Sequence, residues 1–119
     1  MQVLLVTSRQ TMRWIIPKGN VDFHMSPHQA AAREALEEAG VVGEIGRKPI
    51  GVFRYVKLIA QGATVKAKVI VFPLAVSREL DDWPEMGQRE RRWFSQLEAA
   101  EAVQETDLSD LIRSFKSKG

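Results

Sequence analysis

Residues 19–41, GNVDFHMSPHQAAAREALEEAGV, contain one complete helix with its own start and stop signals. Ser26 followed by Pro27 predicts the start, because a capping hydroxyl there precedes proline at the first helical position. Gln29 stands three residues after Ser26 and completes a capping box. Gly40 predicts the end, since glycine readily adopts the left-handed conformation that closes a helix. The local signals therefore predict a helix that ends just before Gly40.

Three glutamates of this helix share one face. Glu34, Glu37 and Glu38 are spaced i, i+3 and i+4, which brings their carboxylates onto one side of a helix. Carboxylates this close repel one another, by roughly a few tenths of a kcal/mol for each exposed pair, unless a cation lies between them. Mg²⁺ binds a few carboxylates and keeps water and substrate phosphate oxygens in its remaining positions. The face therefore indicates phosphate chemistry, although an isolated pattern of this kind is also typical of a solvated helix surface.

Strands are predicted on both sides of the helix. Val3–Thr7 and Trp14–Ile16 are apolar and β-rich, and the polar turn between them predicts neighbouring strands. After the helix, Gly43–Phe53 is short and turn-rich. Phe53–Ile59 and Val65–Ser77 then predict the two strands of a hairpin.

The last third of the chain predicts a loop, a short strand and two helices. Leu80–Gln88 is acidic and contains proline, so we expect a loop, and Arg91–Phe94 predicts a short strand. Ser95 with Glu98 three residues later is a second capping box, which opens a helix that reaches about Val103. The final helix carries apolar residues at helical spacing, namely Leu108, Leu111, Ile112 and Phe115.

Length and composition indicate a small soluble protein. The chain has 119 residues, which predicts a single domain over residues 1–119. It is 45% apolar and 27% charged, the usual balance of a globular protein, and it has no cysteine for a disulfide or a thiolate site. No stretch approaches the roughly 20 apolar residues that span a bilayer, and the N-terminus lacks the order of a secretory signal. We therefore predict a cytoplasmic protein without a membrane partner.

The helix and its flanks match a known signature. The segment resembles that of the Nudix hydrolases, G-x5-E-x7-R-E-U-x-E-E-x-G-U, in which U is aliphatic. The matching positions are Gly19, Arg33, Glu34, Glu37, Glu38, Gly40 and Val41, with the small Ala35 in the first aliphatic place. Met25 departs from the signature, which has glutamate there. The flanking segments Trp14–Gly19, Leu80–Glu85 and Arg92–Phe94 are similar to the diphosphoinositol and diadenosine polyphosphate phosphohydrolase branch.

The resemblance implies a fold, a reaction and a metal site. The implied fold is α/β, the α/β/α Nudix sandwich with a mixed curved sheet between helices, and the alternation of predicted strands and helices agrees with it. The implied activity is that of a Mg²⁺-dependent pyrophosphohydrolase, with Mn²⁺ as a substitute, that cleaves a phosphoanhydride bond by a metal-activated water. The implied metal ligands are Glu34, Glu37, Glu38 and the backbone carbonyl of Lys18.

The resemblance also implies which residues are catalytic. Arg33 is expected to orient a helix carboxylate through its forked donors, so the implied catalytic residues of the helix are Arg33, Glu37 and Glu38. Family members often take a catalytic base from the loop before the final Trp-Phe segment, and we expect Glu85 to serve here. The alternatives in that loop are Asp82 and Glu90. The missing carboxylate at Met25 puts full catalytic efficiency in doubt but leaves the helix ligands in place.

Basic residues are frequent on the expected substrate side, where arginine offers forked donors and lysine a mobile charge to phosphate. Lys66 and Lys68 alternate with apolar neighbours, so they share one face of a strand and are the preferred phosphate contacts there. The predicted substrate-binding residues are Lys18, Arg54, Lys66, Lys68 and Arg89. Further basic residues on this side are Lys57, Arg91 and Arg92. A solvated surface is the alternative for any one of them.

The predicted partner is a small phosphorylated substrate, such as a diadenosine polyphosphate or a diphosphoinositol polyphosphate. The alternative is a non-catalytic Nudix-fold module that binds a nucleotide or polyphosphate, which Met25 favours. The acidic helix and the formal net charge of only +2 argue against a nucleic-acid partner. In the Nudix family another strand usually precedes the one expected at Val3–Thr7, so either the sequence starts late or the sheet has an open edge. An open edge invites pairing with a second chain, which favours a homodimer.

Overall fold

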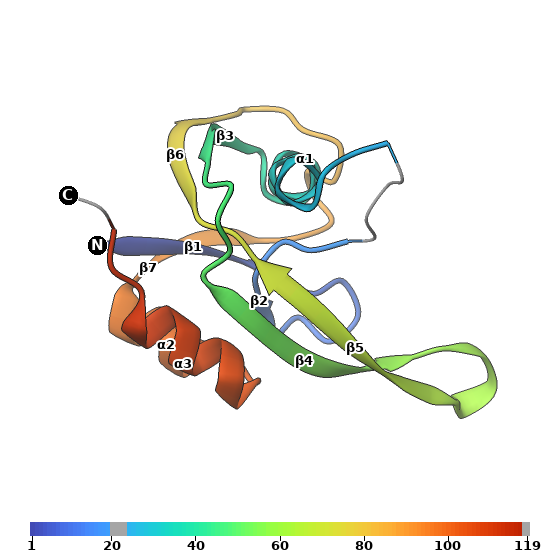
Figure 1. Cartoon of the computed structure of the whole chain (residues 1–119). Coiled ribbons are helices and arrows are strands. Elements are labelled where there is room, and N and C mark those ends of the chain that lie inside the picture. Colours follow the sequence, from blue (N-terminus) through green and yellow to red (C-terminus); the bar gives the residue numbers. More distant parts are fainter. Residues whose placement is uncertain (20–23, 118–119) are drawn as a thin grey trace.

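Seven strands and three α-helices make up the described chain, which is residues 1–19 and 24–117 of a computed structural model. In chain order they are β1 (Gln2–Thr7), β2 (Trp14–Ile15), α1 (Pro27–Ala39), β3 (Val41–Ile45), β4 (Gly51–Leu58), β5 (Thr64–Val71), β6 (Leu74–Glu79), β7 (Arg91–Ser95), α2 (Gln96–Ala102) and α3 (Thr106–Ser114). Figure 1 shows α1 on one side of β1, and α2 with α3 on the other side. The predicted α/β class and its helix–sheet–helix layering are confirmed.

Strand β1 separates two hydrophobic cores. Leu5 and Val6 are both 0% exposed, and because successive side chains of a strand point to opposite faces, each belongs to a different core. The core under α1 contains Val6, Ile15, Ala35, Ala39 and Val41. The core under α2 and α3 contains Leu5, Phe53, Val71, Phe94, Ala99, Ala100, Val103, Leu108 and Ile112. The position of α1 is therefore fixed by a small, mainly aliphatic contact, since its buried apolar residues are alanines.

The strands pair in three antiparallel groups. β1 lies between β2 and β7, β3 pairs with β6, and β4 pairs with β5. The sheet expected between the helices is thus made of these three groups, and the pairings between its named strands are antiparallel. The β4–β5 hairpin, closed by a short 3₁₀ turn at Ala60–Gly62, extends well beyond the rest of the chain (Figure 1).

Two strand predictions were wrong. The expected single strand Val65–Ser77 is two strands with different partners, because β5 ends before Phe72-Pro73 and β6 begins after it. Proline has no N–H to donate to a ladder, and the Pro73 carbonyl instead accepts from Gly46 N–H at 2.8 Å. The segment Gly43–Phe53, predicted as turn-rich, holds most of β3 and the start of β4.

The expected open edge at the first strand was also wrong. β1 pairs with β7 from Gln2 to Val6 and with β2 at Val6 and Thr7, so it has a neighbour on each side. The homodimer that this edge suggested stays a prediction. In the described part of the chain, no helix is long and apolar enough to cross a membrane.

Both predicted capping boxes are confirmed. The Ser26 side chain accepts from Gln29 N–H while the Gln29 side chain accepts from Ser26 N–H, and α1 ends at Gly40 in the left-handed region with φ 64°. Ser95 and Glu98 make the same reciprocal pair at the start of α2. These caps fix where α1 begins and ends, and so fix which of its turns faces the sheet.

Two glycines test how far the fold depends on the close approach at the end of α1. A Cβ on Gly40 would lie 2.4 Å from the Trp83 ring, whereas a Cβ on Gly62, whose φ is 77°, meets nothing within 4 Å. Gly62→Ala should cost only the left-handed backbone strain, about 1–2 kcal/mol. Gly40→Ala should lower the free energy of unfolding by a further 1–3 kcal/mol or so, because it also overpacks the ring. Urea unfolding measures both, and equal losses would show that Trp83 moves aside without cost.

Candidate active site

A cavity of about 830 Å³ opens between the C-terminal half of α1, the loops around Arg9 and Lys18, the β4–β5 hairpin and the loop that precedes β7. Six cationic side chains line it, namely Arg9, Lys18, Arg33, Lys57, Lys68 and Arg89. Among residues 1–19 and 24–117, three carboxylates line it, namely Glu34, Glu38 and Glu85. The cavity therefore offers acidic groups on α1 and a mostly basic surround, the combination that a metal ion and a phosphorylated molecule require together.

Glu38 is the most unusual carboxylate of this cavity. It is only 4% exposed, and its Oε1 accepts from Lys18 N–H at 3.4 Å and lies 3.8 Å from an Arg89 nitrogen. Burial raises the pKa of Glu38 to about 8, and a hydrogen bond with the Glu34 side chain adds to the rise. Arg89 and the Lys18 N–H oppose it. Two carboxylates thus share one site, and without a cation one of them is best accommodated with a proton.

Gly19 brings the chain against this pair. A Cβ on Gly19 would lie 2.3 Å from the Glu34 carboxyl carbon and within 2.6 Å of both its oxygens. Any side chain at this position would displace the Glu34 carboxylate. The motif glycine is therefore required for close approach, and its neighbour Lys18 is thereby held next to Glu38.

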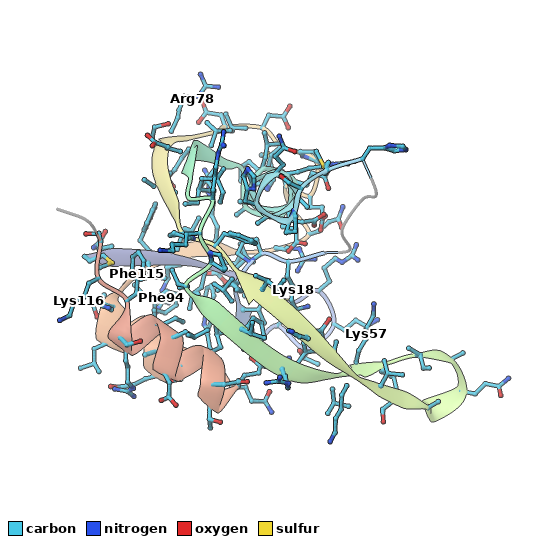
Figure 2. The ribbon with its side chains drawn as sticks, viewed as in Figure 1. Lys18, Lys57, Arg78, Phe94, Phe115 and Lys116 are labelled. Atoms are coloured by element: carbon cyan, nitrogen blue, oxygen red, sulfur yellow. The ribbon has the colours of Figure 1, made fainter. Side chains whose placement is uncertain are left out.

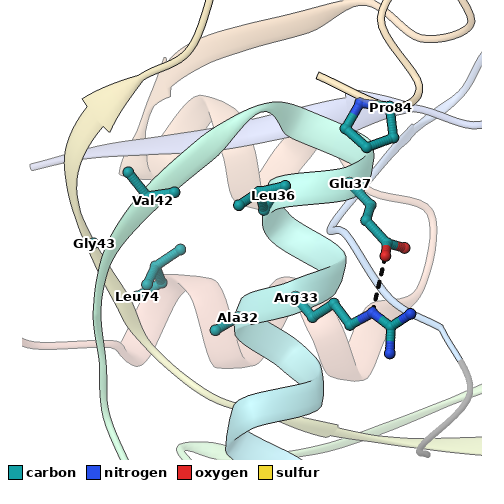
Figure 3. Close-up of a pocket in the computed structure, with 8 residues that line it drawn as sticks. All are labelled: Ala32, Arg33, Leu36, Glu37, Val42, Gly43, Leu74 and Pro84. Carbon is teal, nitrogen blue, oxygen red and sulfur yellow. Dashed lines mark hydrogen bonds and ion pairs between the residues drawn. The ribbon is translucent and has the colours of Figure 1, made fainter. Parts of the chain in front are cut away.

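Glu37 faces a different hollow. Its Oε1 accepts from Arg33 Nε at 2.9 Å, and both residues line a second hollow of about 380 Å³, which lies between α1, β3, β6 and Pro84 (Figure 3). The predicted role of Arg33 in orienting a helix carboxylate agrees with this contact. Arg33 Nη1 also lies 3.8 Å from the sulfur of Met25, so the residue that replaces the signature glutamate contacts the same arginine.

Glu85 lies where the sequence placed it, in the loop over α1. Its N–H donates to the Glu37 carbonyl at 3.0 Å, which ties this loop to the helix. Its side chain accepts from Arg89 Nε at 2.9 Å and lines the cavity with Glu34 and Glu38. The two alternative candidates for the catalytic base, Asp82 and Glu90, are exposed and do not line the cavity.

The predicted substrate-binding residues divide into two groups. Lys18, Lys68 and Arg89 line the cavity, whereas Arg54 and Lys66 do not. Arg54 follows Phe53, which is buried, so its side chain projects from the opposite face of β4. Lys66 is likewise exposed on β5, one position before Ala67, which lines the cavity.

Two further basic residues have structural roles instead. Arg91 donates to the carbonyls of Ala39, Gly40 and Leu80, and its guanidinium lies 4.1 Å from the Trp83 ring centre, so it closes the C-terminal end of α1. Arg92 lies over the rings of Trp14 and Phe94.

Arg9 and Tyr55 line the cavity although the sequence analysis did not select them. Arg9 is held close to the loop that precedes β7 by a hydrogen bond to Gln88, 79 positions away, which no local pattern indicates. The sequence could have indicated Tyr55, because every second residue of a strand points to the same face, and Tyr55 shares one face of β4 with Phe53 and Lys57. The Lys18 ammonium lies 4.4 Å from the Tyr55 ring centre, and Figure 2 shows Lys18 and Lys57 along the hairpin.

Residues 1–115 match the family model described as NUDIX domain. The chain belongs to the Nudix family. It is 38% identical over 107 residues to Nudix hydrolase 12, mitochondrial, of Arabidopsis thaliana, covering 85% of this chain and 51% of that protein. It is 40% identical over 106 residues to diphosphoinositol polyphosphate phosphohydrolase 3-alpha of Mus musculus, covering 87% of this chain and 60% of that protein. The chain thus spans little more than half the length of these Nudix relatives.

The fold is shared with a solved structure. The crystal structure of a C. elegans Ap4A hydrolase binary complex superposes with a TM-score of 0.66 at 24% sequence identity, covering 94% of this chain and 81% of that chain. At this identity the similarity concerns the fold alone.

The Nudix helix α1 presents its three signature glutamates unequally. Glu34 and Glu38 face the cavity, while Glu37 is turned to Arg33, so no three acidic or histidine side chains gather as a finished metal site within residues 1–19 and 24–117. The donor chemistry nevertheless suits a hard divalent cation, because two carboxylates in mutual contact border open space. A cation there would replace the proton that the pair shares.

Proton release on metal binding tests this arrangement. At pH 7 Glu38 carries a proton, because its pKa is about 8, and a ligand carboxylate must lose that proton. Mg²⁺ titrated into the protein should therefore release a proton at pH 7, and the release should fade as pH rises above about 8. Calorimetry in two buffers of different ionisation enthalpy measures it, and Glu38→Gln should abolish it.

The same shift predicts the pH dependence of stability in chelator. The folded-state pKa of Glu38 lies above its ordinary value of 4.5, so the contribution of this group to stability is fully present below pH 4.5 and is lost as pH rises through about 8.

In the metal titration, Mg²⁺ binding without proton release at pH 7 would contradict the assignment of Glu38 as the carboxylate that carries the proton.

Proposed function

We propose that this Nudix domain is a Mg²⁺-dependent pyrophosphohydrolase, which cleaves a phosphoanhydride bond in a nucleoside-diphosphate-linked or polyphosphate substrate. The observation that carries the proposal is the pairing of Glu34 with the buried Glu38 at the floor of a cavity lined by six cationic side chains. A simple solvated helix face would leave these carboxylates exposed and apart. Burying one of them has a large desolvation cost, which a bound cation would offset.

The helix carboxylates are the proposed metal ligands. Glu34 and Glu38 already face the cavity, and Glu37, one residue before Glu38, would join them by exchanging its Arg33 contact for the ion. The backbone carbonyl of Lys18 is the fourth proposed ligand, since the Lys18 N–H already lies beside Glu38. Mg²⁺, or Mn²⁺ in its place, supplies an activated water and neutralises charge on the leaving phosphate.

The remaining cavity residues have proposed roles in binding and proton transfer. Glu85 would accept the proton of the attacking water, because within the described part of the chain it is the one cavity carboxylate that α1 does not supply. Arg9, Lys18, Lys57 and Lys68 would bind the phosphates on either side of the scissile bond. Binding of this kind places the phosphorus near the metal and contributes electrostatic stabilisation of the developing charge.

The proposed substrate is a diadenosine polyphosphate or a diphosphoinositol polyphosphate. The named mouse relative is a diphosphoinositol polyphosphate phosphohydrolase, and the named C. elegans structure is an Ap4A hydrolase. The cationic surround supports a substrate with several phosphates in a row, since each lysine or arginine on its own contributes little to affinity at an exposed site. A cytoplasmic location and a homodimer remain predictions.

The second candidate is a binding module without turnover. Met25 favours it, because the signature carboxylate is missing where the side chain meets Arg33. Wild-type protein that binds the same substrates but hydrolyses none of them would support this candidate.

Glu37→Gln is the decisive substitution for the enzyme. It removes the charge that Mg²⁺ requires while helix propensity changes little. Hydrolysis of dinucleoside polyphosphates, diphosphoinositol polyphosphates and nucleoside triphosphates should fall by on the order of a hundredfold or more, because water activation depends on the ion. The matched control is Glu101→Gln on the exposed face of α2, which should leave turnover unchanged. Unchanged hydrolysis by a folded Glu37→Gln protein would remove Glu37 from the metal site.

A further inference from the structure

Arg89 is buried although it lines a cavity. Its side chain is only 9% exposed, and its donors are directed to protein acceptors. Nε donates to Glu85 Oε1 at 2.9 Å, Nη1 donates to the Thr7 carbonyl at 3.1 Å, and Nη2 lies 3.8 Å from Glu38 Oε1. One planar guanidinium therefore spans the end of β1, the loop carboxylate and the helix carboxylate.

The anchor of this arrangement is the end of β1. Thr7 is 2% exposed, its N–H donates to the Glu90 carbonyl at 3.0 Å, and its Oγ1 accepts from Glu90 N–H at 2.9 Å. These two bonds fix the backbone beside Arg89. The Arg89 side chain therefore begins next to the fixed backbone of Glu90 and ends at the fixed carbonyl of Thr7. Its guanidinium has little freedom to turn toward a ligand.

The backbone of Glu85 is also held, by its N–H bond to the Glu37 carbonyl. The side chain of Glu85 has rotatable bonds that this backbone bond does not restrain. Among the described contacts, the hydrogen bond and ion pair from Arg89 hold its carboxylate, and the same guanidinium approaches Glu38. Arg89 thus sets the position of Glu85 relative to Glu38.

The other cavity cations differ from Arg89. Arg9, Lys57 and Lys68 are exposed, so their charged ends are accessible to phosphate. Substrate contact, the role predicted for Arg89 from sequence, suits those residues better. We propose that Arg89 is a positioning residue, which holds the Glu85 carboxylate at a fixed place above the Glu34–Glu38 pair so that the proton acceptor and the metal ligands act on the same water. This inference rests on the proposed function.

Lysine cannot replace the planar guanidinium of Arg89. Arg89→Lys keeps the positive charge, but a single ammonium cannot reproduce planar donation to Thr7 and Glu85 together. Misplacement of a catalytic group by about 1 Å can cost on the order of a hundredfold in rate. Arg89→Lys should therefore lower kcat by roughly tenfold to a hundredfold while KM changes by no more than about threefold.

A double-mutant cycle separates positioning from substrate binding. If Arg89 acts through Glu85, then Arg89→Lys in a Glu85→Gln background should lower kcat by about threefold or less, because the group it positions is already gone. Lys57→Met is the matched control, since it removes an exposed cavity cation. It should raise KM and have the same effect in both backgrounds. Melting temperatures of all variants show that each is folded.

Two outcomes would overturn the positioning role while leaving the proposed function intact. One is a rise in KM with unchanged kcat for Arg89→Lys, and the other is an equal loss of kcat in both backgrounds. Should Arg89→Lys fail to fold, Glu85→Asp replaces it, because shortening the side chain by one methylene moves the carboxylate while keeping its charge. Unchanged kcat for Glu85→Asp would also overturn the role. No hydrolysis by the wild-type protein on any substrate would overturn the proposed function itself.

Discussion

The burial of the Glu38 carboxylate is the constraint on which the active site depends. A carboxylate that is 4% exposed needs compensation from hydrogen bonds, a counter-charge or a proton. The Lys18 N–H supplies a hydrogen bond and Arg89 supplies the counter-charge, while the side chain of Glu34 stabilises the proton that Glu38 carries. Each of these partners comes from a different part of the chain, so the buried carboxylate brings the pre-helix loop, the loop before β7 and α1 itself to a single point.

The packing of α1 against the sheet holds Glu38 in this buried position. Its buried apolar residues are alanines, so the helix approaches the sheet closely, as a larger side chain would not allow. At its C-terminal end Gly40 leaves room for the Trp83 ring, and Arg91 donates to the last carbonyls while lying over that ring. At the other end Ser26 closes the first turn. Both ends are therefore held, and the register of the carboxylates is fixed.

Sequence alone predicted the elements whose signals are local. The capping box at Ser26, the left-handed glycine at Gly40 and the face shared by Glu34 and Glu38 depend on residues within one or two turns of one another. The β3–β6 pairing was missed, because it joins Val41–Ile45 to residues about thirty positions later, and its register contains a bulge at Val42 and Gly43. The break at Pro73 was missed because the apolar pattern continues through it.

The basic residues show most clearly where prediction from sequence ends. The family resemblance favours a phosphorylated ligand, but whether a given cationic side chain meets that ligand depends on which acceptors the fold places beside it. Arg91 donates to backbone carbonyls, and Arg92 lies over aromatic rings. Arg54 and Lys66 project outside the cavity. Arg9, which no local pattern selects, reaches the cavity through contact with Gln88 across the sequence. Only long-range packing distinguishes these cases.

Charge in the cavity is arranged in two levels, and this arrangement favours binding metal and substrate together. Three carboxylates and the buried Arg89 form the inner level, while the other cationic side chains surround it. A divalent cation alone would be attracted by the carboxylates but repelled by the surrounding lysines and arginines. A polyphosphate alone would be attracted by the outer cations but repelled by Glu34 and Glu85. If both bound, phosphate oxygens would complete the shell of the cation and cancel its excess charge. Each ligand would then remove the repulsion that the other meets, so the proposed metal and substrate sites would be coupled, and such a coupling is reciprocal.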